Sequence, residues 1–341
     1  MFQLKEFTLT NAVSGNEKAM REKVLESIKP YATDIKVDSI GNVIAFKKGT
    51  ASGGKKFVIS AHMDEVGFIV TDITEDGYIK FKSVGGIDPR IMLAQRVTIG
   101  DKRVPGVMGI KAVHLQSPEE RKNVVKEKEM YIDIGASSKE AALSKVQKGD
   151  YVAFDSSYKE LGDGVIKAKA LDDRVGCALM AELIKQDYPN DIYFCFTVQE
   201  EVGIRGATIA AKRIKADVAL MLEATTCADT AGSEPHEYAT EFGKGPVLSI
   251  MDRGAYSDRD FNRFIEKLAK DNNIEYQYKK TSMGGNESRA FQTASLPCRT
   301  AAISMPARYI HSPVSCIKKC DMEKMYQLVK VICENIHGFE I

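Results

Sequence analysis

The chain has 341 residues, 44% of them hydrophobic and 28% charged, so it is long enough for a large core and for two domains. Its 48 basic and 47 acidic residues give a net charge of +1, which supplies no general attraction to nucleic acid or to an anionic membrane. We therefore expect neither as a partner. No segment approaches the roughly 20 apolar residues of a transmembrane helix, and the N-terminus lacks the apolar core of a signal peptide. The seven cysteines form no CxxC pair, which indicates reduced thiols and a cytoplasmic protein.

The beginning of the chain alternates between helix and strand patterns. Apolar residues at helical spacing predict a helix over residues 16–29, which Pro30 ends. Short strands are predicted over residues 43–46 and 57–60. This alternation is typical of α/β proteins.

The pattern changes between about residues 67 and 164. Six short β-like runs occur there, at residues 68–73, 78–81, 96–99, 104–110, 130–134 and 151–154. Gly, Pro and Asp separate them. Regular short strands with turn signals predict a small β-barrel-like unit.

The helix and strand alternation returns after Lys169. Helices are predicted over residues 175–185, 207–215, 258–272 and 321–337, and strands over 192–198, 218–222 and 298–304. A mostly parallel sheet with helices on both faces accounts for this order. We expect one catalytic α/β domain, residues 1–66 and 165–341, interrupted by an inserted β domain at 67–164.

Histidines and acidic residues recur at the ends of the predicted strands. His62 and Asp64 follow the strand at 57–60, Glu200 and Glu201 follow 192–198, Glu223 follows 218–222, His311 follows 298–304, and Asp172 opens the helix at 175. In open α/β sheets, ligands bind at the carboxyl edge of the strands. We therefore expect these groups to converge at one edge of the sheet.

Imidazole and carboxylate ligands without thiolates suit zinc, cobalt or manganese in a hydrolytic site. Two histidines and three carboxylates are what two divalent ions need when one carboxylate bridges them. Each group also has a structural interpretation: Asp172 could cap a helix, His62 could be a core histidine, and Glu223 a solvated acid. The Glu200 and Glu201 pair could merely favour the dipole of the following helix. Their convergence favours a two-metal site.

Four motifs stand in a fixed order along the chain: AHMDE at 61–65, LDDR at 171–174, EEVGIRGA at 200–207 and RYIHSP at 308–313. Together they resemble the TET-type, glutamyl aminopeptidase-like family of two-metal aminopeptidases. Segments 106–114 and 130–136 also resemble the inserted domain of that family. The resemblance implies a catalytic domain of the co-catalytic zinc peptidase type, a PDZ-like insertion used for dimerisation, and homo-oligomers that range from dimers to hollow tetrahedral dodecamers.

The resemblance also implies roles for individual residues. One metal would be bound by His62 and Glu223, the other by Glu201 and His311, and Asp172 would bridge them. Two divalent ions per subunit are expected, zinc or cobalt, with manganese possible. Glu200 would be the general base that takes a proton from a metal-bridging water as it attacks the scissile carbonyl. Asp64 is placed to orient the imidazole of His62.

The expected activity is removal of N-terminal residues from short peptides. The metal ligands alone leave open another two-metal amidohydrolase, such as a deacylase or a carboxypeptidase-like enzyme, and a non-catalytic member of the family. The chain departs from the family pattern at Glu223, where Asp is common, and at GGNESR in 284–289, where a GGTD-like stretch is usual. Arg289 or Arg308 could favour an acidic N-terminal side chain, or either could pair with a neighbouring carboxylate.

Overall fold

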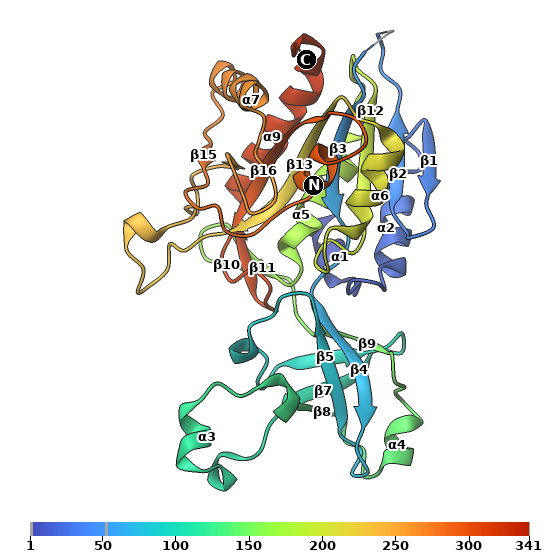
Figure 1. Cartoon of the computed structure of the whole chain (residues 1–341), viewed down its shortest axis with the longest axis vertical. Helices are drawn as coiled ribbons and strands as arrows, with labels where there is room; N and C mark the ends of the chain where they lie inside the picture. Colours follow the sequence, from blue (N-terminus) through green and yellow to red (C-terminus); the bar gives the residue numbers. More distant parts are fainter. Residues whose placement is uncertain (1–2, 52–53, 341) are drawn as a thin grey trace.

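The computed structural model describes residues 3–51 and 54–340. Figure 1 shows two bodies, an α/β body and a β barrel below it. The strands of the main sheet are β1 (Asp34–Val37), β2 (Val43–Lys47), β3 (Phe57–His62), β12 (Ile192–Thr197), β13 (Val218–Thr226), β14 (Val247–Leu248), β15 (Gln277–Tyr278) and β16 (Arg299–Ala307). Their order in space is β1-β2-β12-β3-β13-β16-β14-β15.

The centre of this sheet is parallel. β12, β3, β13 and β16 run in one direction, while β2 and β14 flank them antiparallel. The register sets Thr197 opposite His62 and Met221 opposite Ser60. The carboxyl ends of the central strands therefore meet at one edge, which is where the sequence analysis expects the functional groups.

Helices cover both faces of the sheet, as predicted. On one face lie α1 (Leu4–Leu9), α2 (Lys18–Ile28), α5 (Leu171–Leu183), α7 (Arg259–Asp271) and α9 (Lys319–Asn335). On the other lie α6 (Arg205–Ile214) and α8 (Ser288–Gln292). Successive residues of a strand point to opposite faces, so Phe57 and Ile59 of β3 join the first core and Val58 joins the second.

The segment between β3 and α5 contains a closed antiparallel barrel. Its strands are β4 (Gly67–Ile73), β5 (Ile79–Val84), β6 (Arg96–Ile99), β7 (Val104–Gly109), β8 (Tyr131–Asp133) and β9 (Tyr151–Phe154), in the order β4-β5-β8-β7-β6-β9. Each strand overlaps one of the predicted β-like runs. Phe68 packs edge-on against Phe81 and Phe154 in the barrel core. Two short helices, α3 (Pro118–Lys122) and α4 (Lys139–Leu143), lie outside it.

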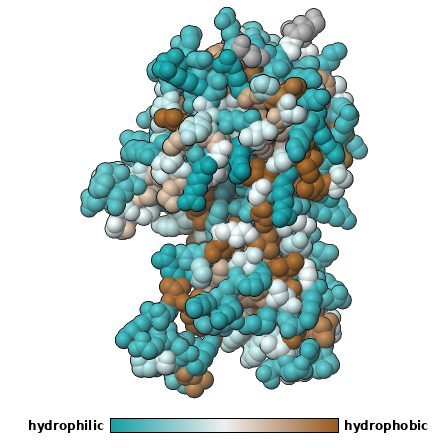
Figure 2. All heavy atoms as spheres, in the orientation of Figure 1, coloured by the Kyte–Doolittle hydropathy of each residue, from teal (hydrophilic) through white to brown (hydrophobic). Residues whose placement is uncertain are grey.

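A small antiparallel sheet completes the fold. It consists of β10 (Lys159–Leu161), β11 (Val165–Ala168) and β17 (Ser315–Lys318). Figure 2 shows a largely hydrophilic surface, with several apolar patches near the waist between the two bodies. Within the described part of the chain, no helix has the length and apolar character needed to cross a membrane.

Some boundaries differ from the prediction. β13 continues to Thr226, so Glu223 lies within the strand instead of following it. The helix predicted from residue 175 begins at Leu171, but Asp172 and Asp173 have non-helical backbone angles, and their shared peptide bond is cis. Short elements, among them α1, β1 and β10, were not predicted, because such short segments carry little periodicity.

Candidate active site

All five predicted ligand side chains meet at the carboxyl edge of the sheet. His62 ends β3, Asp172 opens α5, Glu201 follows β12, Glu223 lies near the end of β13, and His311 follows β16. The parallel central strands deliver four of them to one edge. The fifth, Asp172, enters where α5 begins to pack on β3 and β13.

Asp172 lies between the two histidines. Its Oδ1 is 3.3 Å from Nε2 of His62, and its Oδ2 is 3.3 Å from Nε2 of His311. Glu223 Oε2 lies 3.9 Å from the same nitrogen of His62, and Glu201 Oε2 lies 3.3 Å from that of His311. The potential ligand atoms form two groups that share Asp172, with the atoms of each group within 4.8 Å of one another.

These buried carboxylates carry more negative charge than two histidines balance. Burial raises the pKa of Glu201 to about 7 and raises that of Glu223 well above its ordinary value. Burial also opposes ionisation of Asp172, but its contacts with both histidines hold its pKa below the ordinary value. Among residues 3–51 and 54–340, no lysine or arginine pairs with these three acids. The donor set and its excess charge fit two divalent cations.

The Glu200 carboxylate belongs to neither group. No side-chain hydrogen bond or ion pair engages it within the described residues, and burial raises its pKa well above the ordinary value. Glu200 and Glu201 lie in the turn between β12 and α6, and the helix begins only at Arg205 with Ile204 before it. Neither glutamate therefore lies in the first turn of α6, where acids that favour the helix dipole would stand.

Asp64 ties the turn to the end of β3. This fully buried carboxylate accepts hydrogen bonds from the backbone N–H groups of Glu200 (3.0 Å) and Glu201 (3.2 Å). It also accepts from Ser14 Oγ at 2.6 Å, and its Oδ1 lies 3.5 Å from Nδ1 of His62. Asp64 thus contacts both the imidazole of His62 and the backbone of the turn that carries Glu200 and Glu201.

The barrel contributes a contact to His311. The imidazole Nδ1 lies 2.8 Å from the carbonyl oxygen of Gly86. An N–H at Nδ1 that donates to this carbonyl leaves the lone pair of Nε2 facing Asp172 and Glu201. A cavity of about 500 Å³ adjoins this contact and is lined by Gly86, Asp88, Tyr309 and Val314, among others. It offers room for a peptide beside the histidine.

The two arginines proposed for substrate differ in their surroundings. Arg308 makes a bidentate ion pair with Asp229, with Nε to Oδ1 and Nη2 to Oδ2 both at 2.9 Å, and its guanidinium lies over the ring of Phe242. Arg308 therefore pairs with a neighbouring carboxylate, which was the alternative to a role in substrate binding. Arg289 is exposed, and the structure of the described residues gives it no ion pair. Of these two arginines, only Arg289 has a guanidinium without an ion pair among the described residues.

Glu287 is a further acidic residue beside the site that was not predicted from the sequence. This fully buried carboxylate accepts short hydrogen bonds from the hydroxyls of Ser60 and Thr197, and burial raises its pKa. Its backbone N–H lies 3.4 Å from Oε1 of Glu223. The signals that could have found it are the two hydroxyl residues, which interrupt otherwise apolar strands.

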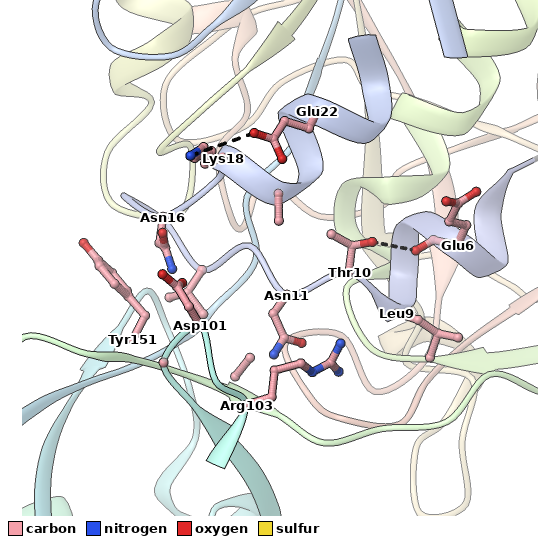
Figure 3. Close-up of a pocket in the computed structure, with 14 residues that line it drawn as sticks. Glu6, Leu9, Thr10, Asn11, Asn16, Lys18, Glu22, Asp101, Arg103 and Tyr151 are labelled. Atoms are coloured by element: carbon pink, nitrogen blue, oxygen red, sulfur yellow. Dashed lines mark hydrogen bonds and ion pairs between the residues drawn. The ribbon is translucent and has the colours of Figure 1, made fainter. Parts of the chain in front are cut away.

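A second cavity lies between the N-terminal segment and the barrel (Figure 3). It has a volume of about 570 Å³. Asn11 and Asn16 approach it from the N-terminal segment, while Asp101, Arg103 and Tyr151 approach it from the barrel. The cavity therefore lies where the barrel meets the N-terminal segment, whose Ser14 hydroxyl donates to Asp64.

Comparison with known proteins identifies the family of this chain. The model of the M42 glutamyl aminopeptidase family matches residues 41–328. The chain belongs to the M42 glutamyl aminopeptidase family. This M42 chain is 42% identical over 334 residues to a putative aminopeptidase of Acetivibrio thermocellus, with 97% of each chain covered.

Solved structures of TET peptidases share the whole fold. The TET aminopeptidase of the marine sediment archaeon Thaumarchaeota archaeon SCGC AB-539-E09 superposes with a TM-score of 0.94 at 34% identity, over 99% of this chain and 98% of that one. The Pyrococcus horikoshii TET1 peptidase, which can assemble into a tetrahedron or a large octahedral shell, gives 0.87 at 35% identity, over 97% and 98%. These matches confirm the predicted family, the fold class with its inserted barrel, and a hydrolase that acts on peptides.

Proposed function

We propose that this M42 enzyme is a metal-dependent aminopeptidase that removes N-terminal residues from short peptides. The observation that carries the proposal is the position of Asp172, whose two oxygens each lie 3.3 Å from a different histidine. A carboxylate shared in this way suits a pair of divalent ions better than one.

The proposed ligands are His62, Asp172 and Glu223 for one ion and Asp172, Glu201 and His311 for the other. Nitrogen and oxygen donors of this kind suit zinc or cobalt, with manganese as a further candidate. When bound, the two metal ions would lower the pKa of a water molecule at the site and polarise the scissile carbonyl. Glu223 is longer by one methylene than the aspartate common in the family, but it offers the same ligand atoms.

Glu200 is the proposed general base. Its carboxylate is not engaged by any other described side chain, and burial raises its pKa, so it can take up a proton and release it again to the leaving amine. Asp64 is the proposed positioning residue, because it holds the backbone of Glu200 and Glu201. Neither role requires a change in the geometry of the two ligand groups.

A free N-terminal amine is the proposed recognition element of the substrate. The proposed binding place of this amine is beside the metal ions and the acidic side chains of the site. The alternative is another two-metal amidohydrolase, such as a deacylase or a carboxypeptidase-like enzyme. Acetylated peptides discriminate between them, since an aminopeptidase leaves them uncut.

Glu200→Gln tests the proposal. The variant should keep both metal ions by mass spectrometry but lose several orders of magnitude in turnover of aminoacyl anilides. Glu22→Gln, on the exposed surface of α2, is the matched control. Chelation should abolish wild-type activity, and added zinc, cobalt or manganese should restore it. Near-normal turnover by Glu200→Gln would remove Glu200 as the base, and cleavage of acetylated peptides would favour the alternative.

We further propose a homo-oligomer in which the domain at residues 67–164 makes a dimer, with the tetrahedral dodecamer as the larger form. The assemblies of the Pyrococcus horikoshii relative support this. Native mass spectrometry distinguishes the two states. The seven free thiols support the cytoplasm as its location.

A further inference from the structure

We propose that three buried charged residues, Glu65, Lys169 and Arg174, are positioning residues that fix the bridging side chain Asp172 relative to His62. We call them the Glu65 cluster. The inference rests on the proposed two-metal function. It assigns a task to three side chains that form no hydrogen bond with the ligand groups themselves.

The Glu65 cluster consists of buried charges that form ion pairs with one another. Lys169 Nζ donates to both carboxylate oxygens of Glu65 at 2.7 Å, and Arg174 Nη2 lies 3.5 Å from Oε1. None of the three side chains is more than 3% exposed. The backbone N–H of Ala12 also donates to Oε1 at 2.9 Å. The carboxylate therefore has partners on several sides.

The cluster brackets the metal-ligand residues along the chain. Glu65 follows His62 by three residues, while Lys169 and Arg174 stand on either side of Asp172. The backbone between them is irregular: Ala170 has a positive φ of 53°, and Asp172 lies outside the helical region. Helix propensity therefore does not set the position of Asp172. The contacts that Lys169 and Arg174 make on either side of it can fix that position.

The cluster lies next to the site. A small cavity of about 10 Å³ is lined by Glu65 and Lys169 together with Asp172, Glu201 and His311. A space of this size holds at most about one water, so a displacement of the cluster reaches the ligands directly.

The cluster also anchors the N-terminal segment against the end of β3. Arg174 Nε donates to the carbonyl of Met63 at 2.8 Å, and its Nη1 donates to that of Thr10 at 2.9 Å. Lys169 Nζ donates to Asn11 Oδ1 at 3.0 Å, on the wall of the cavity in Figure 3. Ser14, at the end of this segment, reaches Asp64. The cluster therefore acts on the Glu200 turn as well, through Asp64.

Stability alone does not account for such a cluster. A buried ion pair is often no more stabilising than a well-packed apolar pair of similar volume, because both charges lose their hydration. What the ions add is a fixed distance and direction between segments. The segments fixed here carry His62, Asp172 and Asp64.

The double variant Glu65→Gln/Lys169→Met tests the proposal. It removes both charges of the Glu65–Lys169 pair and leaves Arg174 bonded to the carbonyls of Met63 and Thr10. With Co²⁺ as the probe, we expect a folded protein by circular dichroism, at least a tenfold loss of Co²⁺ affinity, and an altered visible spectrum of the bound ion. The kcat should fall at least tenfold, with little change in KM, because the substrate contacts are untouched.

Two further variants keep the test decisive. Glu65→Asp retains every charge but shortens the carboxylate by one methylene, so it should fold and still weaken Co²⁺ binding several-fold. Arg299→Met/Asp258→Asn removes an ion pair of 3.3 Å at the opposite end of β16, and it should leave Co²⁺ affinity, spectrum and kcat unchanged. This control separates a local effect from general destabilisation.

The proposal is overturned if the folded variants of the Glu65 cluster keep the wild-type Co²⁺ affinity, spectrum and kcat. A wild-type protein that binds no Co²⁺ would overturn the proposed function itself, and the inference with it. The two failures are distinguishable, because the first leaves an intact metal centre in the wild-type enzyme and the second does not.

Discussion

The backbone N–H of Glu200 donates a hydrogen bond to Oδ1 of Asp64 at 3.0 Å, across 136 residues of sequence. The N–H of the next residue, Glu201, donates to Oδ2 of the same carboxylate at 3.2 Å. One buried side chain therefore holds the turn that carries both glutamates against the end of β3. The proposed base and a proposed ligand share this support.

Asp64→Asn should impair both turnover and stability. Asparagine has a single acceptor oxygen, so it cannot receive the donors that now reach both oxygens, and its NH₂ would face backbone N–H groups. We expect kcat to fall about 10- to 100-fold and unfolding to become easier by about 1–3 kcal/mol. Enzyme kinetics and urea unfolding measure the two effects.

Asp321→Asn is the matched control for that variant. Asp321 is also fully buried, and it accepts the backbone N–H groups of Gly243 at 2.7 Å and Gly245 at 2.8 Å. Its substitution should cost similar stability but leave kcat of the folded enzyme unchanged. Equal losses of kcat in both variants would mean that Asp64 acts only on stability.

Arg289→Ala should reduce any preference for acidic N-terminal residues. The exposed guanidinium has no ion-pair partner in the described structure, so its charge is available to a substrate carboxylate. An exposed ion pair contributes little, so we expect kcat/KM for a Glu anilide to fall only about three- to tenfold relative to Leu and Lys anilides. Arg263→Ala, on the surface of α7, is the control. An unchanged preference would remove Arg289 as a specificity residue.

Glu17→Gln should make the protein less sensitive to pH. Burial raises the pKa of Glu17 to about 7, despite the N–H groups of Gly15 and Gln199 that donate to its Oε1, and nearby Asp64 raises it further. The folded state therefore binds this proton more tightly than the unfolded state, and stability is lost as pH rises from about 4.5 to 7. The full penalty, about 3–4 kcal/mol, applies above pH 7.

Glutamine can keep both hydrogen bonds at Oε1 without the charge. The melting temperature of Glu17→Gln relative to wild type should therefore be higher at pH 8 than at pH 5. Glu22→Gln, one helical turn further along and exposed, should show the same difference at both pH values. A Glu17→Gln difference that is equal at pH 5 and pH 8 would contradict the prediction.

Gly206→Ala should displace α6 from the end of β12. A Cβ at this position would lie 2.3 Å from the carbonyl oxygen of Val198 and 2.4 Å from Oδ1 of Asn42. Because backbone atoms can move only at a cost in stability, we expect the free energy of unfolding, measured in urea, to fall by about 1–3 kcal/mol. Turnover should also fall, because the Glu200 turn joins these two elements. Gly338→Ala meets nothing within 4 Å and should be neutral. Equal midpoints for both variants would refute the clash.

The sequence predicts the α/β order and the convergence of the ligand groups because both follow from short-range patterns. Buried parallel strands are continuous apolar runs, and polar residues at their ends share an edge by topology. Glu287 escaped this reasoning because its partners, Ser60 and Thr197, come from two different strands. The pairing of Glu65 with Lys169 escaped it as well, since only the folded chain brings residues on either side of the barrel together.

The two ligand groups contain residues that lie far apart in the sequence, from His62 in β3 to His311 after β16. The ribosome translates His62 long before His311. His311 follows β16, a central strand that the sheet needs to be complete. During synthesis, a partial chain therefore holds neither a finished sheet nor a complete ligand set. If the proposed ligand set is required for catalysis, the nascent polypeptide cannot cut peptides in its surroundings before His311 has been translated.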